Sequence, residues 1–179
     1  SINSVKLAGA AAAGGAATTT ISGFATGATF EQTALLGTNQ AVELTGAFTG
    51  AADSVTLKAS GTNGYANAGA LTVGSVETLS IVLNDSDTTA ATTMFDLNLD
   101  ASSVTSVTVT GDAGIDFTNG SMAAVRTMDA SGVTATGAAG VVTFTATALL
   151  DTTITGAAGN DVLTGNSGAD TITGNGGTD

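Results

Sequence analysis

The chain has 179 residues and a formal net charge of −12, with 15 acidic and three basic residues. Its hydrophobic fraction of 42% is enough for a packed core, unlike that of acidic disordered proteins. The scarcity of Lys and Arg excludes ordinary binding to the phosphate backbone of nucleic acids. The absence of His and Cys excludes His-based catalytic triads, His-based zinc sites and disulfide bridges.

No run of about 18 apolar residues occurs, so the sequence predicts no membrane span. No signal peptide is visible either. The chain begins with Ser1 instead of Met, and we expect both of its ends to be cuts within a longer polypeptide.

The first 50 residues show few clear elements. Residues 4–7 and 41–45 alternate apolar and polar side chains and are predicted strands. The Ala/Gly run at 8–17 favours a tight corner over a helix, because each Gly costs a helix about 1 kcal/mol. Residues 30–36 are predicted to form one or two helical turns.

From about residue 53 the alternation becomes regular, which is typical of half-buried strands. Polar residues, many of them Thr, separate the side chains that are predicted to face inward. These inward residues are Val55, Leu57, Leu79, Ile81, Leu83, Phe95, Leu97, Leu99, Val107, Val109, Val142, Phe144 and Ala146. Turn-forming Gly, Asn, Asp and Ser stand between the strands. Many short strands with small corner residues predict an elongated β-solenoid, whose stacked coils complete one another's core, or a related sandwich.

A nine-residue repeat organises the chain from 156 to 179. The units read G-A-A-G-N-D-V-L-T, then G-N-S-G-A-D-T-I-T, then G-N-G-G-T-D, where the chain stops. Gly permits tight turns that expose backbone carbonyls, and the Asp at position 6 adds a carboxylate. Calcium prefers such oxygen ligands. Strand alternation places Leu163 and Ile172 in the core, and Val162 and Thr171 outside.

These units resemble the RTX nonapeptide G-G-x-G-x-D-x-U-x, which folds as a calcium-bound parallel β-roll. Ala157, Asn166 and Asn175 replace the second glycine of that pattern. The resemblance implies an all-β fold, a parallel β-solenoid (β-helix) ending in an RTX-type calcium β-roll. The alternative for this stretch is a flexible Gly/Asp-rich tail.

We accordingly predict three parts. Residues 1–50 are an Ala/Gly/Thr-rich segment that starts the solenoid or forms a small subdomain. Residues 51–150 are the solenoid coils, and residues 151–179 are the truncated calcium-binding repeats.

In an RTX-type roll two nonapeptides make one coil, so residues two repeat lengths apart stack. Asp161 and Asp179 then flank one calcium row, whereas Asp170 lies on the opposite side and needs a partner beyond the chain end. Backbone carbonyls around four further residues complete the predicted shell of Ca2+: Gly159, Asn160, Gly168 and Gly177.

A lone match to the same spacing, G-D-A-G-I-D, makes Asp112 and Asp116 further metal candidates, with an ordinary β-turn as the alternative. No partner for them stands one or two repeat lengths away in the sequence. If 95–100 is one strand, its polar side chains share one face that either binds calcium or is simply solvated. These side chains are Asp96, Asn98 and Asp100. Asp85 and Asp87 indicate either a weaker calcium site or an Asx-type turn.

Thr143, Thr145 and Thr147 form a T-x-T-x-T pattern. Such an array either orders water, as in some ice-binding solenoids, or is an ordinary β-branched solvent face. No nucleophile elbow, Walker A loop or dinucleotide fingerprint occurs, and we expect no enzyme activity.

In composition and in its terminal repeats the chain resembles the lattice-forming part of surface-layer (S-layer) proteins that Gram-negative bacteria export by type I secretion. That resemblance implies a calcium-dependent two-dimensional lattice at the bacterial cell surface, with other copies of the chain as partners. Cell-surface polysaccharide would be bound through parts not in this chain. The alternatives are a repeat segment of an RTX adhesin and the non-catalytic secretion and folding domain of an RTX exoprotein.

Overall fold

The computed structural model describes residues 1–8, 17–34, 36–37, 40–46, 48, 50–62, 64–87 and 94–179. These residues form parallel strands and one 3-10 helix, η1 (Ala138–Gly140). The strands of the first half are β1 (Ile2–Leu7), β2 (Ala17–Gln32), β3 (Gln40–Gly46), β4 (Ser54–Gly61), β5 (Leu71–Val73), β6 (Thr78–Asp85), β7 (Phe95–Asp96) and β8 (Leu99–Asp100). Those of the second half are β9 (Ser106–Gly111), β10 (Ile115–Asp116), β11 (Thr127–Val133), β12 (Thr136–Gly137), β13 (Val142–Thr145), β14 (Thr153–Thr155), β15 (Ala158–Gly159), β16 (Val162–Thr164) and β17 (Thr171–Thr173).

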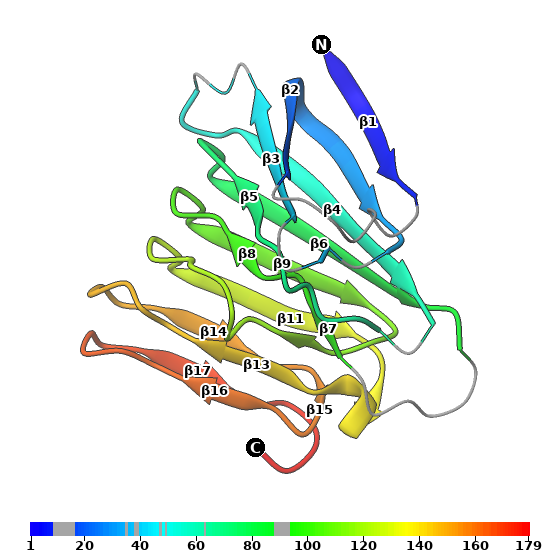
Figure 1. The fold of residues 1–179 in the computed structure, drawn as a ribbon. Helices are drawn as coiled ribbons and strands as arrows, with labels where there is room; N and C mark the ends of the chain where they lie inside the picture. The colour runs from blue at the N-terminus through cyan, green and yellow to red at the C-terminus, as the bar shows by residue number, and fades with distance from the viewer. Residues whose placement is uncertain are drawn as a thin grey trace.

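The strands stack along one axis, with the two chain ends at opposite ends of the stack (Figure 1). One broad face runs β4-β6-β9-β11-β14-β17, and a second runs β3-β5-β8 within the same sheet. A separate sheet runs β7-β10-β13-β16. Each coil of the chain contributes a strand to successive faces, which is the arrangement of a parallel β-solenoid and confirms the predicted fold class.

The core is a set of columns in which apolar side chains of successive coils lie in register. Val55, Leu79, Val107, Met128 and Ile154 form one such column, and all five are almost fully buried. All thirteen residues predicted from the alternation to face inward are buried. An isolated coil could not bury its apolar side chains, so the core forms only when coils stack on one another.

The N-terminal strands belong to the same sheet as the later coils. β2 is a long strand whose first half pairs with β3 and whose second half pairs with β4. Gly23 and Gly27 adopt positive φ values, which lets the strand bend between the two faces. The predicted helical turns at 30–36 are wrong, because Phe30 lies in β2 with its ring in the core. Of the predicted Ala/Gly corner, residues 9–16 lie outside the described part of the chain.

The alternation predicted a single strand over residues 95–100, and this prediction is wrong. These residues form a corner between β7 and β8, which lie in different sheets, and Asn98 at this corner has a φ of 44°. Leu97 still points inward because the corner wraps around the core. Asp96, Asn98 and Asp100 therefore do not share a strand face.

The coils shorten at the C-terminal end. Thr153 pairs with Thr171, so one coil there spans two nonapeptides, as predicted. Leu163 packs against the core while Val162 is 56% exposed, which confirms the predicted register. Ile172 lies in register with Ile154 but is 46% exposed, because β17 is the last strand of this sheet that the structure describes.

Hydroxyl side chains form two rows across the outside of the broad face. The first row, in register from strand to strand, is Ser54, Thr78, Ser106, Thr127, Thr153 and Thr171. The second is Thr56, Ser80, Thr108, Thr155 and Thr173, interrupted by Asp129 between Thr108 and Thr155. Neighbours in a row are separated by the strand spacing of about 4.8 Å. The array thus runs across the strands on this face, whereas Thr143, Thr145 and Thr147 lie on or just after β13 in the other sheet.

Candidate metal centre

The three repeat aspartates lie at the coil corners, on two edges of the roll. The backbone N–H of Asp161 donates to Asp179 Oδ1 at 2.9 Å, so these two residues are stacked on one edge. On the other edge the N–H of Thr152 donates to Asp170 Oδ1, also at 2.9 Å. The stacking predicted for Asp161 and Asp179 is therefore present, and Asp170 has its coil neighbour within the chain.

The carboxylates of Asp161 and Asp170 also close their own turns. The N–H of Ala157 donates to Asp161 Oδ2, and that of Asn166 to Asp170 Oδ2, both at 2.6 Å. This geometry explains the glycine at position 1 of each unit. A Cβ on Gly165 would lie 2.5 Å from Asp170 Oδ2, so any larger residue there pushes the carboxylate away.

Glycine is required at position 4 of each unit for a different reason. A Cβ on Gly168 would lie 2.7–2.9 Å from backbone atoms of Leu150 and Asp151, one coil below. A Cβ on Gly177 would meet the backbone of Gly159 in the same way. These glycines allow consecutive coils to approach so closely that corner carbonyls of one coil face the next.

Oxygen atoms converge at the corner beside Gly156. A Cβ on Gly156 would overlap both Asp161 Oδ2 and the carbonyl oxygen of Gly174. A carboxylate oxygen and a carbonyl oxygen from different coils therefore approach the same point. This donor set fits a hard cation such as Ca2+.

Asp161 is the most deeply buried of the repeat aspartates, with 4% of its surface exposed. Burial raises the pKa of its carboxyl group, and the charge of Asp179 adds to the rise, whereas the N–H groups of Ala157 and Val142 act in the opposite direction. Among the described residues, Lys6 and Glu31 form the only salt bridge, so no cationic side chain balances Asp161. A divalent cation at this corner would supply the missing charge.

Side chains at position 5 of the nonapeptide link consecutive coils by hydrogen bonds. Asn160 Oδ1 accepts from the N–H of Thr178 at 3.0 Å, and Asp151 Oδ1 accepts from that of Ala169 at 2.9 Å. Sequence reasoning assigned Asn160 only a carbonyl and missed Asp151. The signal was that Asp151 stands one repeat length before Asn160 and also has a side-chain oxygen.

Asp112 and Asp116 have coil neighbours that the nine-residue period did not reveal. The N–H of Asp85 donates to Asp112 Oδ1 at 2.7 Å, across 27 residues of sequence. Asp116 lies in register with Asp96 on the neighbouring strand. Coils in this region are longer than two nonapeptides, which is why the fixed spacing found no partner. Asp112 therefore makes the same carboxylate-to-backbone contact as the repeat aspartates.

Two of the remaining acidic candidates, Asp85 and Asp96, accept hydrogen bonds within local turns. The N–H of Asp87 donates to Asp85 Oδ1, and that of Asn98 to Asp96 Oδ1, both two residues along the chain. The contact at Asp85 is the Asx-type turn that the sequence allowed as the alternative there, whereas the turn at Asp96 was not predicted. Asp96 is also bonded by Asn119 Nδ2. Within the described residues, no point gathers three or more acidic side chains.

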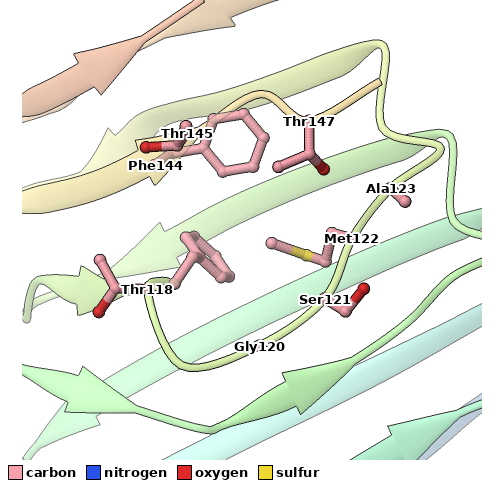
Figure 2. A pocket seen from close by; sticks show the side chains of 9 residues that line it. Thr118, Gly120, Ser121, Met122, Ala123, Phe144, Thr145 and Thr147 are labelled. Atoms are coloured by element: carbon pink, nitrogen blue, oxygen red, sulfur yellow. The ribbon is translucent and has the colours of Figure 1, made fainter. Parts of the chain in front are cut away.

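The solenoid wall contains a cavity of about 340 Å³ between β13 and the loop that follows β10 (Figure 2). Met122 extends into it opposite Phe144, and hydroxyl groups of Thr118, Ser121 and Thr145 lie around it (Figure 2). Its lining contains no titratable side chain, so it offers no group for acid–base chemistry. A second, more open hollow of about 520 Å³ includes Lys58 and Asp112 in its lining.

Comparison with known proteins supports the assignment of the C-terminal coils. A family model for the RTX calcium-binding nonapeptide repeat (4 copies) matches residues 150–179. A search among curated proteins finds no match. RTX nonapeptide repeats bind Ca2+, so the coils at this end form a calcium β-roll. None of the described helices is long and apolar enough to cross a membrane.

Proposed function

We propose that this chain is part of a structural surface-layer protein that assembles, in a calcium-dependent way, into a two-dimensional lattice on the bacterial cell. One observation carries the proposal. The calcium-binding coils continue the parallel ladder of a long solenoid whose broad outer face repeats two rows of hydroxyl side chains. A rigid, repetitive body of this kind suits a building block better than a soluble receptor or a catalyst.

The proposed calcium ligands are those of the repeat corners. The carboxylates are Asp161, Asp170 and Asp179, and the carbonyls lie around Gly159, Asn160, Gly168 and Gly177. The stacking of the corners one coil apart and the close approach of glycine to backbone one coil below both support this set. Ions at these corners hold coils together within one molecule.

The charge distribution supports assembly through the broad face. A net charge of −12 makes copies of the chain repel one another at most orientations. In the two hydroxyl rows of this face, Asp129 is the one charged side chain, so copies approach there with the least repulsion. Calcium would neutralise acidic edges that face each other, and contacts that do not close into rings propagate into arrays.

Asp112 and Asp116 are proposed to bind a calcium ion that links molecules. Asp112 lines the open hollow on the outside of the solenoid and lies against the Asp85 turn, away from the repeats. An ion held there by one molecule has positions left for oxygens of a neighbour.

The setting of this function is extracellular, since proteins with RTX repeats are typically secreted. We propose export by type I secretion and attachment to cell-surface polysaccharide through parts not in this chain. The alternatives are a repeat segment of an RTX adhesin, or the non-catalytic secretion and folding domain of an RTX exoprotein. The calcium β-roll is a structural element in all three.

Electron microscopy of the purified protein with calcium and with chelator tests the proposal. We expect ordered sheets only with calcium, and a soluble monomer in calcium would instead favour the adhesin segment.

Two double variants separate the two kinds of ion. Asp112→Asn with Asp116→Asn should keep the β content measured by circular dichroism but lose the sheets. Asp161→Asn with Asp179→Asn should lower the β content itself. Normal sheets from the first variant would reduce that motif to an ordinary turn.

A further inference from the structure

The corner just before the first repeat differs from the repeat corners. Thr152 lies one repeat length before Asp161, at the position where the repeat has its aspartate. It also lies directly below Asp170 in the stack, because its N–H donates to Asp170 Oδ1. The residue is 1% exposed. A buried hydroxyl therefore occupies the place of a buried carboxylate.

Hydrogen-bond donors surround the carbonyl oxygen at this corner. Thr152 Oγ1 donates to the carbonyl oxygen of Leu150 at 3.0 Å. Asn166 Nδ2, from the coil above, donates to the same oxygen at 2.9 Å and also lies 2.9 Å from Thr152 Oγ1. A carbonyl oxygen has two lone pairs, and both are used here. The Leu150 carbonyl has no lone pair left for a metal ion.

The same contacts account for one of the departures from the RTX pattern. Asn166 stands where the pattern has its second glycine, and its amide reaches back to the preceding coil. Glycine cannot make this bond. The asparagine and the threonine together supply, with uncharged donors, the attraction that an ion supplies at an aspartate corner.

We propose that Thr152, Asn166 and the Leu150 carbonyl form a calcium-independent clamp, which joins the first repeat coil to the solenoid and ends the row of calcium sites on this edge. The β14 strand that follows Thr152 pairs with β11 of the solenoid and folds without calcium. It is the platform on which the calcium-dependent coils stack. The inference goes beyond the proposed function, since it holds whether the parent protein forms lattices or not.

Residue-resolved hydrogen exchange in chelator tests the clamp. In the unmodified chain the β14 amides should exchange slowly and those of β17 rapidly. Thr152→Val keeps the shape of the side chain but removes the hydroxyl, and should speed exchange in β14 about tenfold. The matched control is Thr153→Val, which removes the exposed hydroxyl next to it and should leave β14 unchanged. Equal exchange in the two variants, or rapid β14 exchange in the unmodified chain, would overturn the proposal.

A second variant converts the clamp into a repeat corner. Thr152→Asp removes the donor to Leu150 and restores the carboxylate of the pattern. Calorimetric titration should then show more bound Ca2+ per chain than in the unmodified protein, and protection of β14 should become dependent on calcium. An unchanged number of bound ions with calcium-independent protection would contradict the clamp. This readout does not depend on sheet formation, so failure of the clamp and failure of the lattice proposal are distinguishable.

Discussion

Replacing Gly168 with alanine tests the packing of the calcium coils most sharply. The new Cβ would lie 2.7 Å from the carbonyl carbon of Leu150 and 2.8 Å from the amide nitrogen of Asp151. Both are backbone atoms of the coil below, so neither moves without displacing that coil. Overpacking of this kind costs about 1–3 kcal/mol. We expect a loss of about 2 kcal/mol, in the middle of that range, because the clash is with backbone on one side only.

Gly176→Ala is the matched control, one position earlier in the next unit. Its Cβ would lie 3.4 Å or more from the nearest atoms, which is ordinary contact. Ala158 and Ser167 already occupy the equivalent position in the other units. Removing a glycine where its freedom is not needed stabilises a protein by about 0.4–1 kcal/mol.

The assay is hydrogen exchange of the β17 amides at saturating calcium. A loss of about 2 kcal/mol corresponds to opening that is about 30-fold more frequent. Gly176→Ala should leave the opening unchanged or make it a few-fold rarer. Equal exchange in the two variants would show that the coils do not approach each other as closely as described, and would refute this reasoning.

Three further predictions concern the same coils. Leu163→Asp should cost several kcal/mol by burying a charge in a thin apolar core, whereas Val162→Asp should be nearly neutral, and thermal melts that coincide would show the register to be wrong. Gly165→Ala should weaken calcium binding more than it weakens the fold, because the Cβ displaces the Asp170 carboxylate and not backbone; calorimetric titration that gives unchanged affinity would contradict this. Adding millimolar calcium to chelated protein should raise the β signal in circular dichroism, since extracellular sites bind in that range, and a spectrum indifferent to calcium would count against it.

Much of the solenoid was predictable because its core follows simple alternation. In β4, β6 and β9 every second side chain is apolar and buried, and turn residues mark the ends of the strands. Period two fails where the chain turns a corner around the core. Leu97 is buried at such a corner, so 95–100 mimics a single strand although its two ends lie in different sheets.

The repeat corners were predictable because the sequence repeats with a fixed period. A fixed period of nine places Asp161 and Asp179 one coil apart, which the contact between them confirms. Where coils vary in length, sequence spacing does not reveal the neighbour. The contact between Asp112 and Asp85 and the register of Asp116 with Asp96 depend on coil lengths that only the folded chain sets.

The two hydroxyl rows were missed because they run across strands. In the sequence they appear only as scattered Ser and Thr residues, and the most obvious threonine pattern, around Thr145, lies in the other sheet. The clamp at Thr152 was missed because a threonine where the pattern requires aspartate looks like the absence of a repeat. The role of Thr152 becomes clear only in the structure, where Asn166 donates a hydrogen bond to the same carbonyl oxygen.

Hydrogen exchange across the whole chain, with calcium and with chelator, tests the central claim that a calcium-independent solenoid supports calcium-dependent coils. We predict that β17 is protected only when calcium is present, whereas β6, β9 and β11 are protected under both conditions. Equal protection of β17 with and without calcium, or loss of protection throughout the solenoid in chelator, would contradict the account.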